Sequence, residues 1–408
     1  MKKSRIISLA LVALMCFSLL AGCGEKAPAT SAQPGTTQAP GETGSGTIKV
    51  GILGCHTGDY AVYGLAVKNG AELYIKQLNE KGGINGKKIE LIIADNRADN
   101  SEAVTAFTRM VDQGITALIG DVLTGNTLAV VAEAYPINMP MITASATAAE
   151  VTYNPDTDTV YTNVFRTCFI DPFQGEKMAE FAADILKAKT AAIIFETGND
   201  YAVGLSDAFI AKAGELGIQI VAQEGYATGD VDFKSQLTTI ASKNPDVVFC
   251  PNYYEDDGLI VTQAREVGLT ATFLGGDGWA GVSGFASAED LEGSYYCSAY
   301  APQSSDEVKK FEADYIAAYG ENTLNMFAAN AYDAAMVLCN ALAVAESKGL
   351  VAGTEEYKQA VIDAIRNNSA DLKGITSDGY TFDEHNNPIK NAVIMRLTDG
   401  KEVYDMMF

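Results

Sequence analysis

Residues 48–94 read IKVGILGCHTGDYAVYGLAVKNGAELYIKQLNEKGGINGKKIELIIA, and this stretch decides the class of fold. It begins and ends with short apolar runs, 48–53 and 89–94, each of the length of a buried strand. Between them, residues 61–81 carry apolar side chains at helical spacing, and the glycines of GGINGKK then mark a turn. The order strand, helix, strand predicts two parallel strands joined by a crossover helix.

The same alternation continues along the chain and then restarts. We expect further helices at 101–113, with Ser101 as the N-cap, and at 125–135, 203–216, 233–243, 256–267, 306–319, 327–346 and 355–367. Further strands are expected at 115–119, 141–144, 191–195, 218–222, 247–250 and 271–274. From Gly379 onward the pattern changes to short strands joined by tight turns. The sequence therefore predicts an α/β protein with two lobes, each built on a doubly wound parallel sheet.

The composition of the 408 residues excludes several classes of protein. Apolar residues make up 48% of the chain and charged residues 20%, which is ordinary for a globular protein and unlike a disordered or fibrous one. The formal net charge of −23 repels phosphate backbones, so we expect no nucleic-acid partner. The sequence has two His and no CxxC pair, and we therefore expect neither a metal nor a cofactor.

The first 23 residues have the pattern of an export signal. A short basic start precedes an apolar run, 6–20, that is too short for an ordinary membrane span. The run is followed by Ala-Gly-Cys, which resembles the signal of bacterial lipoproteins; the resemblance implies cleavage of 1–22 and diacylation of Cys23. The alternative is a plain secretory signal that contains a cysteine. Residues 23–47 are rich in Gly, Pro, Ser and Thr and are predicted to be a flexible tether.

Five cysteines follow the export signal, at positions 55, 168, 250, 297 and 339. Their odd number and wide spacing argue against a disulfide framework. Most of them lie in apolar runs of the strand or helix type, so we expect them to be buried as small hydrophobic side chains.

Ligands of open α/β sheets bind beyond the carboxyl ends of the strands, so the segments that follow strands are the places to search. After the strand at 115–119 the chain reads GDVLTGNT (120–127), and the strand at 141–144 continues into SAT (145–147). Neither segment carries the spaced glycines of a phosphate-binding loop. Both offer hydroxyl groups and backbone N–H groups near a helix start, which suit a small anion such as a carboxylate. The alternative is that these Ser and Thr residues only cap helices.

Taken together, segments between 47 and 404 resemble the branched-chain amino-acid binding family of ABC importers, a type of periplasmic binding protein. The likeness lies in the order and spacing of YGLAVKNGAELYIKQLNEKGGINGKKIELIIADN, GITALIGDVLTGNT, PMITASAT, NVFRTCFIDPFQG, NDYAVGLSDAF, GDVDFKSQL, QAREVGL, FLGGDGW and FDEHNNPIKNAVIMRL. The resemblance implies two lobes that close on a ligand around a three-strand hinge. The implied lobes are 47–167 with 301–376, and 168–300 with 377–408.

The resemblance also implies which residues hold the ligand. The carboxylate of the ligand is expected at the hydroxyl groups of Thr124 and Thr147. The ammonium is expected between the backbone carbonyl of Ser145 and the carboxylate of Asp277, where the family often has Glu. The further residues that the resemblance places at or beside the ligand are Gly125, Ala146 and Asp171, and the aromatic walls Tyr63, Tyr201, Tyr253 and Phe327. The chain departs from the family pattern at His56, which could enter the cleft.

These features predict a monomeric receptor for an amino acid that is anchored by lipid on the extracytoplasmic side of the cell membrane. The receptor is expected to deliver its ligand to an ABC permease. The aromatic walls favour an apolar or aromatic side chain, branched-chain ones included. Two alternatives stay open: a receptor for a small amide, a urea-like compound or an aromatic acid, and the ligand-sensing subunit of a signalling system. We do not expect an enzyme, because the sequence has no nucleophile, metalloprotease or phosphate-loop motif.

Overall fold

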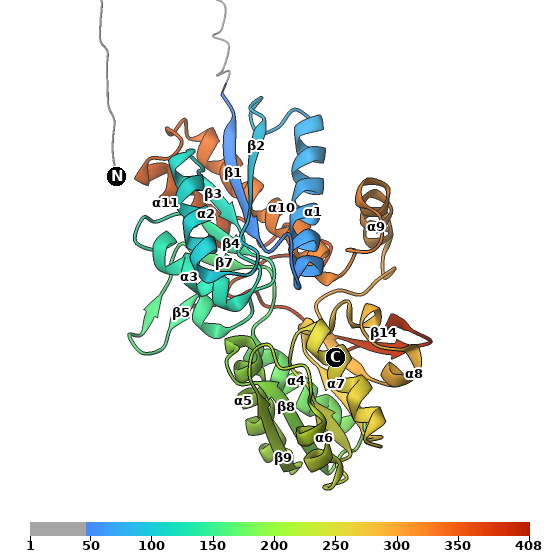
Figure 1. Cartoon of the computed structure of the whole chain (residues 1–408). Helices are drawn as coiled ribbons and strands as arrows, with labels where there is room; N and C mark the ends of the chain where they lie inside the picture. The colour runs from blue at the N-terminus through green and yellow to red at the C-terminus, as the bar shows by residue number, and fades with distance from the viewer. Residues whose placement is uncertain (1–45) are drawn as a thin grey trace, which may run out of the picture. The chain divides into compact units, whose positions relative to one another are not determined.

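The computed structural model describes residues 46–408, which alternate strands and helices as the sequence predicts (Figure 1). The export signal, Cys23 and all but the last residues of the predicted tether lie outside the described residues, so these features stay predictions. The described residues belong to one compact unit, whose strands form two large sheets and one short hairpin. The predicted α/β class is confirmed.

The first sheet is parallel and has the strand order β2-β1-β3-β4-β7. Its strands are β1 (Ile48–Gly54), β2 (Ile89–Asp95), β3 (Ala117–Ile119), β4 (Met141–Thr143) and β7 (Val164–Arg166). The helices that accompany it are α1 (Ala61–Glu80), α2 (Asn100–Asp112), α3 (Thr124–Ala134), α9 (Asp306–Tyr319), α10 (Met326–Ser347) and α11 (Glu355–Asn367). β3, β4 and β7 are buried at every position, as expected for a parallel sheet that is covered on both faces.

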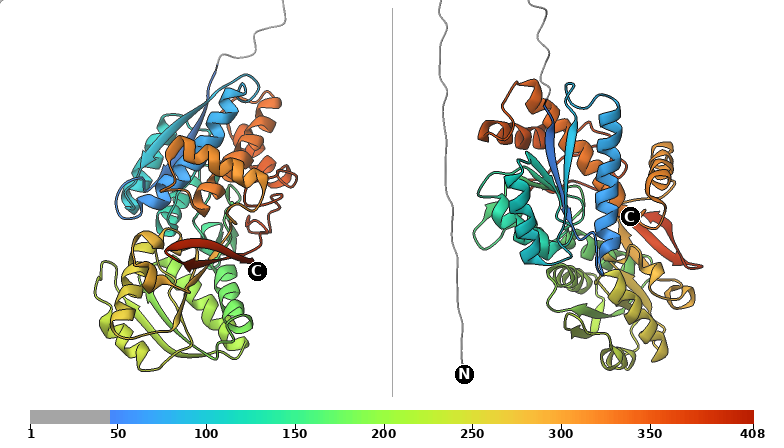
Figure 2. Two further views of the ribbon diagram at one scale, coloured as in Figure 1. Left: turned by 90° about the vertical axis from the view of Figure 1, so that its right-hand side faces the viewer. Right: turned by 45° about the horizontal axis from the view of Figure 1, so that its top comes forward.

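The second sheet has the order β14-β13-β12-β11-β10-β8-β9. Its strands are β8 (Thr190–Glu196), β9 (Gln219–Tyr226), β10 (Val247–Phe249), β11 (Thr272–Gly275), β12 (Tyr295–Ser298), β13 (Val393–Thr398) and β14 (Lys401–Met407). Its helices are α4 (Asp171–Asp184), α5 (Asp200–Glu215), α6 (Lys234–Ala241), α7 (Tyr254–Glu266) and α8 (Ala288–Leu291). The antiparallel pair β13–β14, red in Figure 2, turns through Asp399 and Gly400 at φ values of 50° and 72°, as a two-residue hairpin loop requires.

The chain passes between the two sheets three times. It leaves the first sheet after β7, returns to it after β12 to build α9, α10 and α11, and rejoins the second sheet at β13. α10 lies alongside α1 and contacts β3 and β4 (Figure 1). This helix is long and apolar enough to cross a membrane, but 72% of its most apolar part is buried, as in the core helix of a soluble fold.

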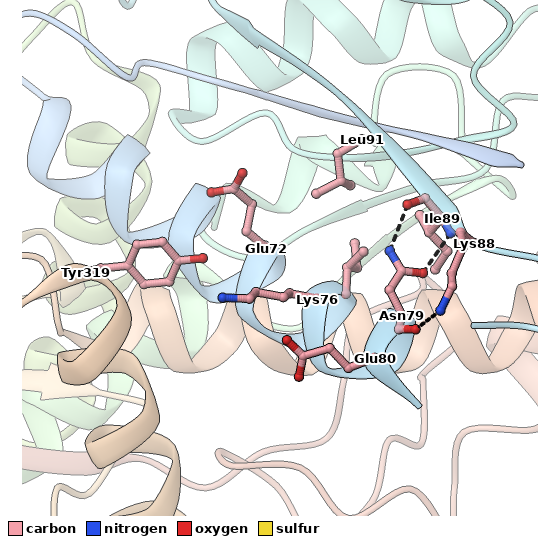
Figure 3. Close-up of a pocket in the computed structure, with 9 residues that line it drawn as sticks. Glu72, Lys76, Asn79, Glu80, Lys88, Ile89, Leu91 and Tyr319 are labelled. Carbon is pink, nitrogen blue, oxygen red and sulfur yellow. Dashed lines mark hydrogen bonds between the residues drawn. The ribbon is translucent and has the colours of Figure 1, made fainter. Parts of the chain in front are cut away.

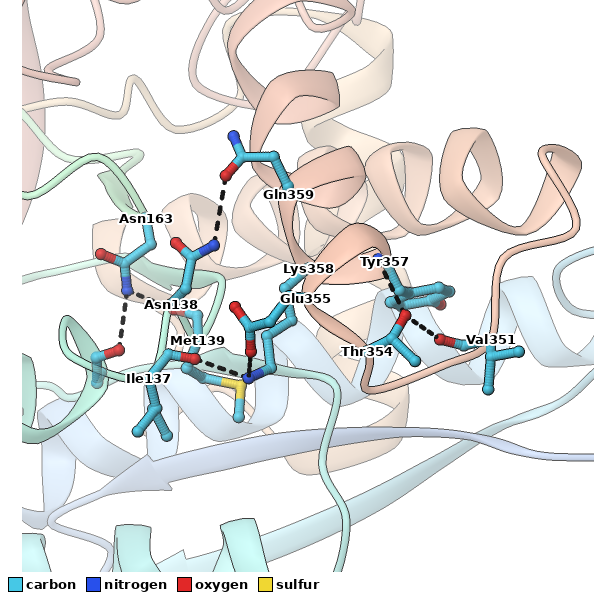
Figure 4. A network of polar contacts seen from close by, with 11 residues as sticks. Ile137, Asn138, Met139, Asn163, Val351, Thr354, Glu355, Tyr357, Lys358 and Gln359 are labelled. Carbon is cyan, nitrogen blue, oxygen red and sulfur yellow. Dashed lines mark hydrogen bonds and ion pairs between the residues drawn. The ribbon is translucent and has the colours of Figure 1, made fainter.

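A network of polar contacts holds α11 against the loop between α3 and β4 (Figure 4). The ammonium group of Lys358 donates to the carbonyl of Ile137 at 2.7 Å, and the amide of Asn138 donates to the side chain of Gln359 at 3.3 Å. Thr354 caps the helix with its hydroxyl group. α11 also packs against α10.

The structure corrects the sequence analysis at several elements. α2 is capped by Asp99, whose carboxylate accepts from the N–H of Glu102 at 2.8 Å, whereas the predicted cap, Ser101, lies within the first turn. α4, β7 and β12 were not predicted. α4 begins at Asp171 and Pro172, and proline in the first turn is a helix-start signal that the sequence analysis did not use. β7 and β12, at three and four residues, are too short to show a periodicity.

All five cysteines of the described chain are free and buried, as predicted. Burial raises the pKa of the Cys168 thiol to about 12 and raises the pKa of the other four as well. These thiols are therefore protonated at neutral pH and pack as small apolar groups.

Candidate functional site

Segments that follow strands of both sheets meet around one small cavity of about 260 Å³. Tyr63, Val122, Leu123, Thr124, Ser145, Thr147 and Phe327 form what we call its first-sheet wall, and Tyr201, Tyr253, Asp277 and Gly278 form its second-sheet wall. All but three of the residues predicted at the ligand lie here. Only about 10 Å³ of this space is open to a water molecule, so the walls as they stand leave room for about one water.

The three predicted residues that do not line the cavity are Gly125, Ala146 and Asp171. Gly125 follows Thr124 on α3 and is half-buried. Ala146 is buried, and its carbonyl already accepts from the guanidinium of Arg166 at 2.9 Å. Asp171 stands at the start of α4, and its backbone N–H donates to the carbonyl of Thr147 at 2.9 Å. His56 does not line the cavity either.

The first-sheet wall offers hydrogen-bond donors. α3 begins at Thr124 behind an apolar N-cap, Leu123, which makes no side-chain cap bond. The first N–H groups of a helix have no acceptor within the helix, and this cap supplies none. The hydroxyl group of Thr147 is buried, makes no hydrogen bond of ordinary geometry among residues 46–408, and lies near Asp171, whose pKa it lowers. Such a helix start beside a buried hydroxyl suits a small anion.

Ser145 presents an acceptor to the same cavity. Its hydroxyl group donates to the carbonyl of Val122 at 2.7 Å, and its backbone N–H donates to the hydroxyl of Thr143 at 3.3 Å. The group that Ser145 has left for a ligand is therefore its backbone carbonyl. The position thus fits a donor on the ligand, such as an ammonium group.

The second-sheet wall contains a buried carboxylate. Asp277 is 1% exposed and opens the short turn after β11. Its Oδ1 accepts from the amide of Gln174 at 3.2 Å, while its Oδ2 is buried with no partner in the described part of the chain. Burial raises the pKa of Asp277 to about 7, and the hydrogen bonds from Gln174 and Tyr201 oppose this rise. A buried carboxylate oxygen without a partner is costly unless a ligand supplies a donor.

Aromatic rings from both walls surround the remaining space. Tyr201 and Tyr253 are stacked with ring centroids 5.1 Å apart. Tyr63 meets Phe327 edge-on at 4.9 Å and Tyr253 at 5.7 Å. Together with Val122 these rings give the cavity an apolar lining beside its polar groups.

The hydroxyl group of Tyr63 joins the two walls directly. It donates to the carbonyl of Gly278 and accepts from the backbone N–H of Tyr254 at 3.1 Å. Gly278 admits no side chain, because a Cβ there would lie 2.3 Å from the carbonyl oxygen of Asn252 and 2.9 Å from the hydroxyl of Tyr201. The structure therefore shows the walls in contact around the cavity.

A larger, open hollow of about 830 Å³ lies on the outer face of α1 and β2 (Figure 3). Its polar side chains are Glu72, Lys76, Asn79, Glu80, Lys88 and Tyr319. The amide of Asn79 bonds both backbone groups of Ile89, at 2.9 and 2.8 Å, and so ties the end of α1 to the start of β2. None of the predicted ligand residues lies here, and the hollow is a feature of the surface.

Several residues of the site were missed by sequence reasoning. Val122, Leu123 and Gly278 line the cavity, and Gln174 holds Asp277 from α4. A helix start at the proline of FIDPFQG (169–175) would have placed Gln174 on the same face as Asp171, three residues earlier. Within residues 46–408 no group of three or more His, Cys, Asp or Glu side chains is placed to hold a metal ion.

Fold and site together define a class of protein. Two α/β sheets with their helices, linked by three crossings, enclose a small cavity of donors, acceptors and aromatic walls, which is typical of a binding protein for a small solute. The chain belongs to the periplasmic binding protein family, whose model matches residues 47–402. This confirms the predicted family, and the chain is an extracytoplasmic solute-binding protein and not an enzyme.

Proteins that are similar to this chain match it over most of its length. A Leu/Ile/Val-binding protein of Rhizobium johnstonii is 32% identical over 319 residues, which are 78% of this chain and 83% of that protein. The solved structure of the leucine binding protein LivK of Thermotoga maritima is 31% identical with a TM-score of 0.79, and the match covers 89% of this chain and 99% of that one. The branched-chain amino acid transporter substrate binding protein LivJ of Streptococcus pneumoniae, solved in complex with isoleucine, is 31% identical with a TM-score of 0.78 and coverages of 89% and 100%.

Proposed function

We propose that the chain binds an amino acid with an apolar side chain, a branched-chain amino acid above all, and presents it to an ABC permease. The observation that carries the proposal is that groups suited to an anion and a group suited to a cation face the same cavity. The helix start at Thr124 and the buried hydroxyl of Thr147 suit an anion, and the unpaired carboxylate oxygen of Asp277 suits a cation. Relatives whose names specify leucine, isoleucine and valine, and the isoleucine complex of LivJ, support this choice.

The two charges of the ligand are divided between the two walls in this proposal. The carboxylate bonds to Thr124, Thr147 and the first N–H groups of α3. The ammonium donates to the carbonyl of Ser145 and to Oδ2 of Asp277, a buried oxygen that makes no hydrogen bond of ordinary geometry within residues 46–408. The side chain then lies among Tyr63, Tyr201, Tyr253 and Phe327.

We further propose that the walls belong to two lobes that close on the ligand. The lobes comprise 47–167 with 301–376, and 168–300 with 377–408, and the segments that cross between them form the hinge. The hydrogen bonds of Tyr63 to Gly278 and Tyr254 support a closed arrangement, because they join α1 to segments of the second sheet. We propose that the protein acts as a monomer.

A thermal-shift experiment tests the proposal. L-leucine or L-isoleucine at a hundredfold excess over Kd is expected to stabilise the folded protein by about 2.7 kcal/mol, because a ligand of the native state raises its stability by mass action. Two analogues serve as controls: 4-methylpentanoate lacks the ammonium, and 3-methylbutylamine lacks the carboxylate. Both are expected to shift the melting temperature much less. A shift produced by urea, small amides or benzoate, with none from any amino acid, would contradict the proposal and favour the alternative class of solute.

We propose that the receptor is anchored to the cell membrane through a diacylated Cys23. The full-length protein, expressed with its signal, is expected to incorporate labelled palmitate and to remain in the membrane fraction. Cys23→Ser is expected to abolish the labelling, since the thiol is the attachment point. Labelling that survives this substitution would remove the lipoprotein assignment, whereas ligand binding by the soluble 48–408 fragment is expected to be unchanged.

A further inference from the structure

Beside the cavity, a buried glutamine joins two buried carboxyl groups. Gln174 lies at the end of the first turn of α4, three residues after Asp171, and is fully buried. Its amide nitrogen donates to Oδ1 of Asp277 at 3.2 Å and to Oδ1 of Asp171 at 3.5 Å. Its amide oxygen accepts the backbone N–H of Asp277 at 2.8 Å. Gln174 thus holds Asp277 by its backbone and its side chain at once.

These bonds fix the direction of the Asp277 carboxylate. Because Gln174 occupies Oδ1, the oxygen left over is Oδ2, which has no partner among the described residues. The packing around the amide is tight. A Cβ on Gly276 would lie 3.2 Å from the amide oxygen of Gln174 and 2.6 Å from the hydroxyl of Tyr201. A carboxylate held by a side chain that cannot itself move is preorganised for its ligand.

The second carboxyl group differs from the first in its surroundings. Asp171 is also fully buried, and its Oδ2 has no partner in the described chain. Its contact with Gln174 is the longer of the two, and its Oδ2 lies against Gly204 of α5, 3.3 Å from where a Cβ would stand. The titratable and charged groups around the pair are Arg166, Cys168, Glu150, Tyr201, Tyr253 and Cys297.

Two buried carboxyl groups that share one amide donor do not both ionise readily, because each charge opposes the other. Burial raises the pKa of both groups, and that of Asp171 rises further because Asp277 is near. The hydroxyl of Thr147 and the charge of Arg166 oppose the rise at Asp171 but leave its pKa well above the usual range, and the shorter bond from Gln174 favours the negative charge at Asp277. The proton of the pair therefore stays on Asp171. Asp277 is then the group that meets a cation.

We propose that Gln174 is the positioning residue of the ammonium site, which aims Oδ2 of Asp277 into the cavity and keeps the negative charge of the Asp171–Asp277 pair on Asp277. This inference rests on the proposed binding of an amino acid. It assigns a role to a side chain that does not itself line the cavity. It also makes the recognition of the ammonium depend on a hydrogen bond between α4 and the turn after β11.

The test is Gln174→Met in the 48–408 protein, because methionine has a similar length and none of the three hydrogen bonds. Isothermal titration calorimetry with L-leucine and 4-methylpentanoate is run from pH 5.5 to pH 8. Kd for L-leucine is expected to rise about tenfold, while Kd for 4-methylpentanoate changes less than twofold. The pH at which L-leucine affinity is half lost is expected to move upward, since the donor that favours the ionised carboxylate is gone.

Gln77→Met is the matched control. Gln77 also accepts from a side chain, Tyr332, and donates to a carboxylate, Asp314, but it lies on α1 beside α9 and α10. Its replacement is expected to change neither ligand selectivity nor the pH midpoint. Gln174→Glu keeps the shape of the side chain and adds a third carboxyl group, and it is expected to steepen the fall of L-leucine affinity with falling pH.

The outcomes separate the two proposals. If the parent protein binds neither probe, the proposed function fails, and the role of Gln174 fails with it. If the parent binds L-leucine, and Gln174→Met weakens both probes equally without a change in the pH midpoint, the glutamine is only structural and this inference is wrong. If Gln174→Met does not fold, an unchanged pH profile in Gln174→Glu would overturn it in the same way.

Discussion

Asp277→Asn is expected to weaken the binding of L-leucine by roughly a hundredfold to several thousandfold. The substitution keeps the size of the side chain and removes its charge, so the ligand ammonium is buried without its anionic partner. Breaking one side of a buried ion pair costs about 3–5 kcal/mol, which converts to this loss of affinity. Calorimetric titration of the parent and the variant at pH 7.5 measures it.

The comparison with Thr124→Ala makes this prediction specific. Loss of a neutral hydroxyl that bonds a carboxylate costs about 1.5–3 kcal/mol, so Thr124→Ala is expected to weaken L-leucine by roughly tenfold to a hundredfold. It should weaken 4-methylpentanoate by the same factor, because both compounds carry the carboxylate. Asp277→Asn should spare 4-methylpentanoate. Equal binding of L-leucine by Asp277→Asn and the parent would show that no cation of the ligand lies at this point.

The features that sequence predicts well are those that repeat locally. The alternation of apolar runs and helical periodicity from 48 to 94 gave the α/β class, since each element has its own period. The rule that ligands lie beyond the carboxyl ends of strands directed attention to Thr124, Ser145 and Thr147, which the structure places at one cavity. Asp277 and the aromatic walls came from the family resemblance, and the structure brings them to the same cavity.

The features that sequence misses depend on side chains that meet through space. The resemblance places Ala146 at the ligand, but its carbonyl is used by Arg166, a buried charge that needs an acceptor. The resemblance places Asp171 beside the cleft, and the structure adds that Asp171 bonds the backbone of Thr147 and is joined to Asp277 by Gln174. No spacing rule shows such a contact, because Gln174 and Asp277 are far apart along the chain.

The N-cap of α2 was also predicted wrongly, between two candidate residues that lie two positions apart. Ser101 and Asp99 are both good N-cap residues, and the pattern of apolar side chains fixes a helix end only to within a residue or two. The structure selects Asp99, whose carboxylate bonds the N–H of Glu102. The first turn of α2 therefore starts one residue earlier than predicted, with no consequence for the cavity.

The affinity for L-leucine is expected to fall about fiftyfold between pH 7 and pH 5. Burial raises the pKa of Asp277 to about 7 in the empty protein, so the carboxyl group takes up a proton as the pH falls through this value. The ammonium binds the ionised form, and binding below pH 7 must expel that proton. The loss is about tenfold for each pH unit and proton, while affinity above pH 7 is nearly constant.

A loss of affinity with falling pH must come from a group of the protein that takes up a proton, because L-leucine keeps the same charges across this range. Titrations from pH 5 to pH 7.5 in two buffers of different ionisation enthalpy should also show proton release that grows as the pH falls. In Asp277→Asn both the slope and the proton release are expected to disappear, even though Asp171 and its raised pKa remain. A slope that persists in Asp277→Asn would assign the proton to Asp171 and place the ammonium between the two carboxyl groups.

An affinity that is flat with pH in the parent protein would mean that Asp277 is ionised before the ligand arrives. The hydroxyl group of Tyr201, which lowers the pKa of Asp277, would then be the donor that keeps this carboxylate ionised.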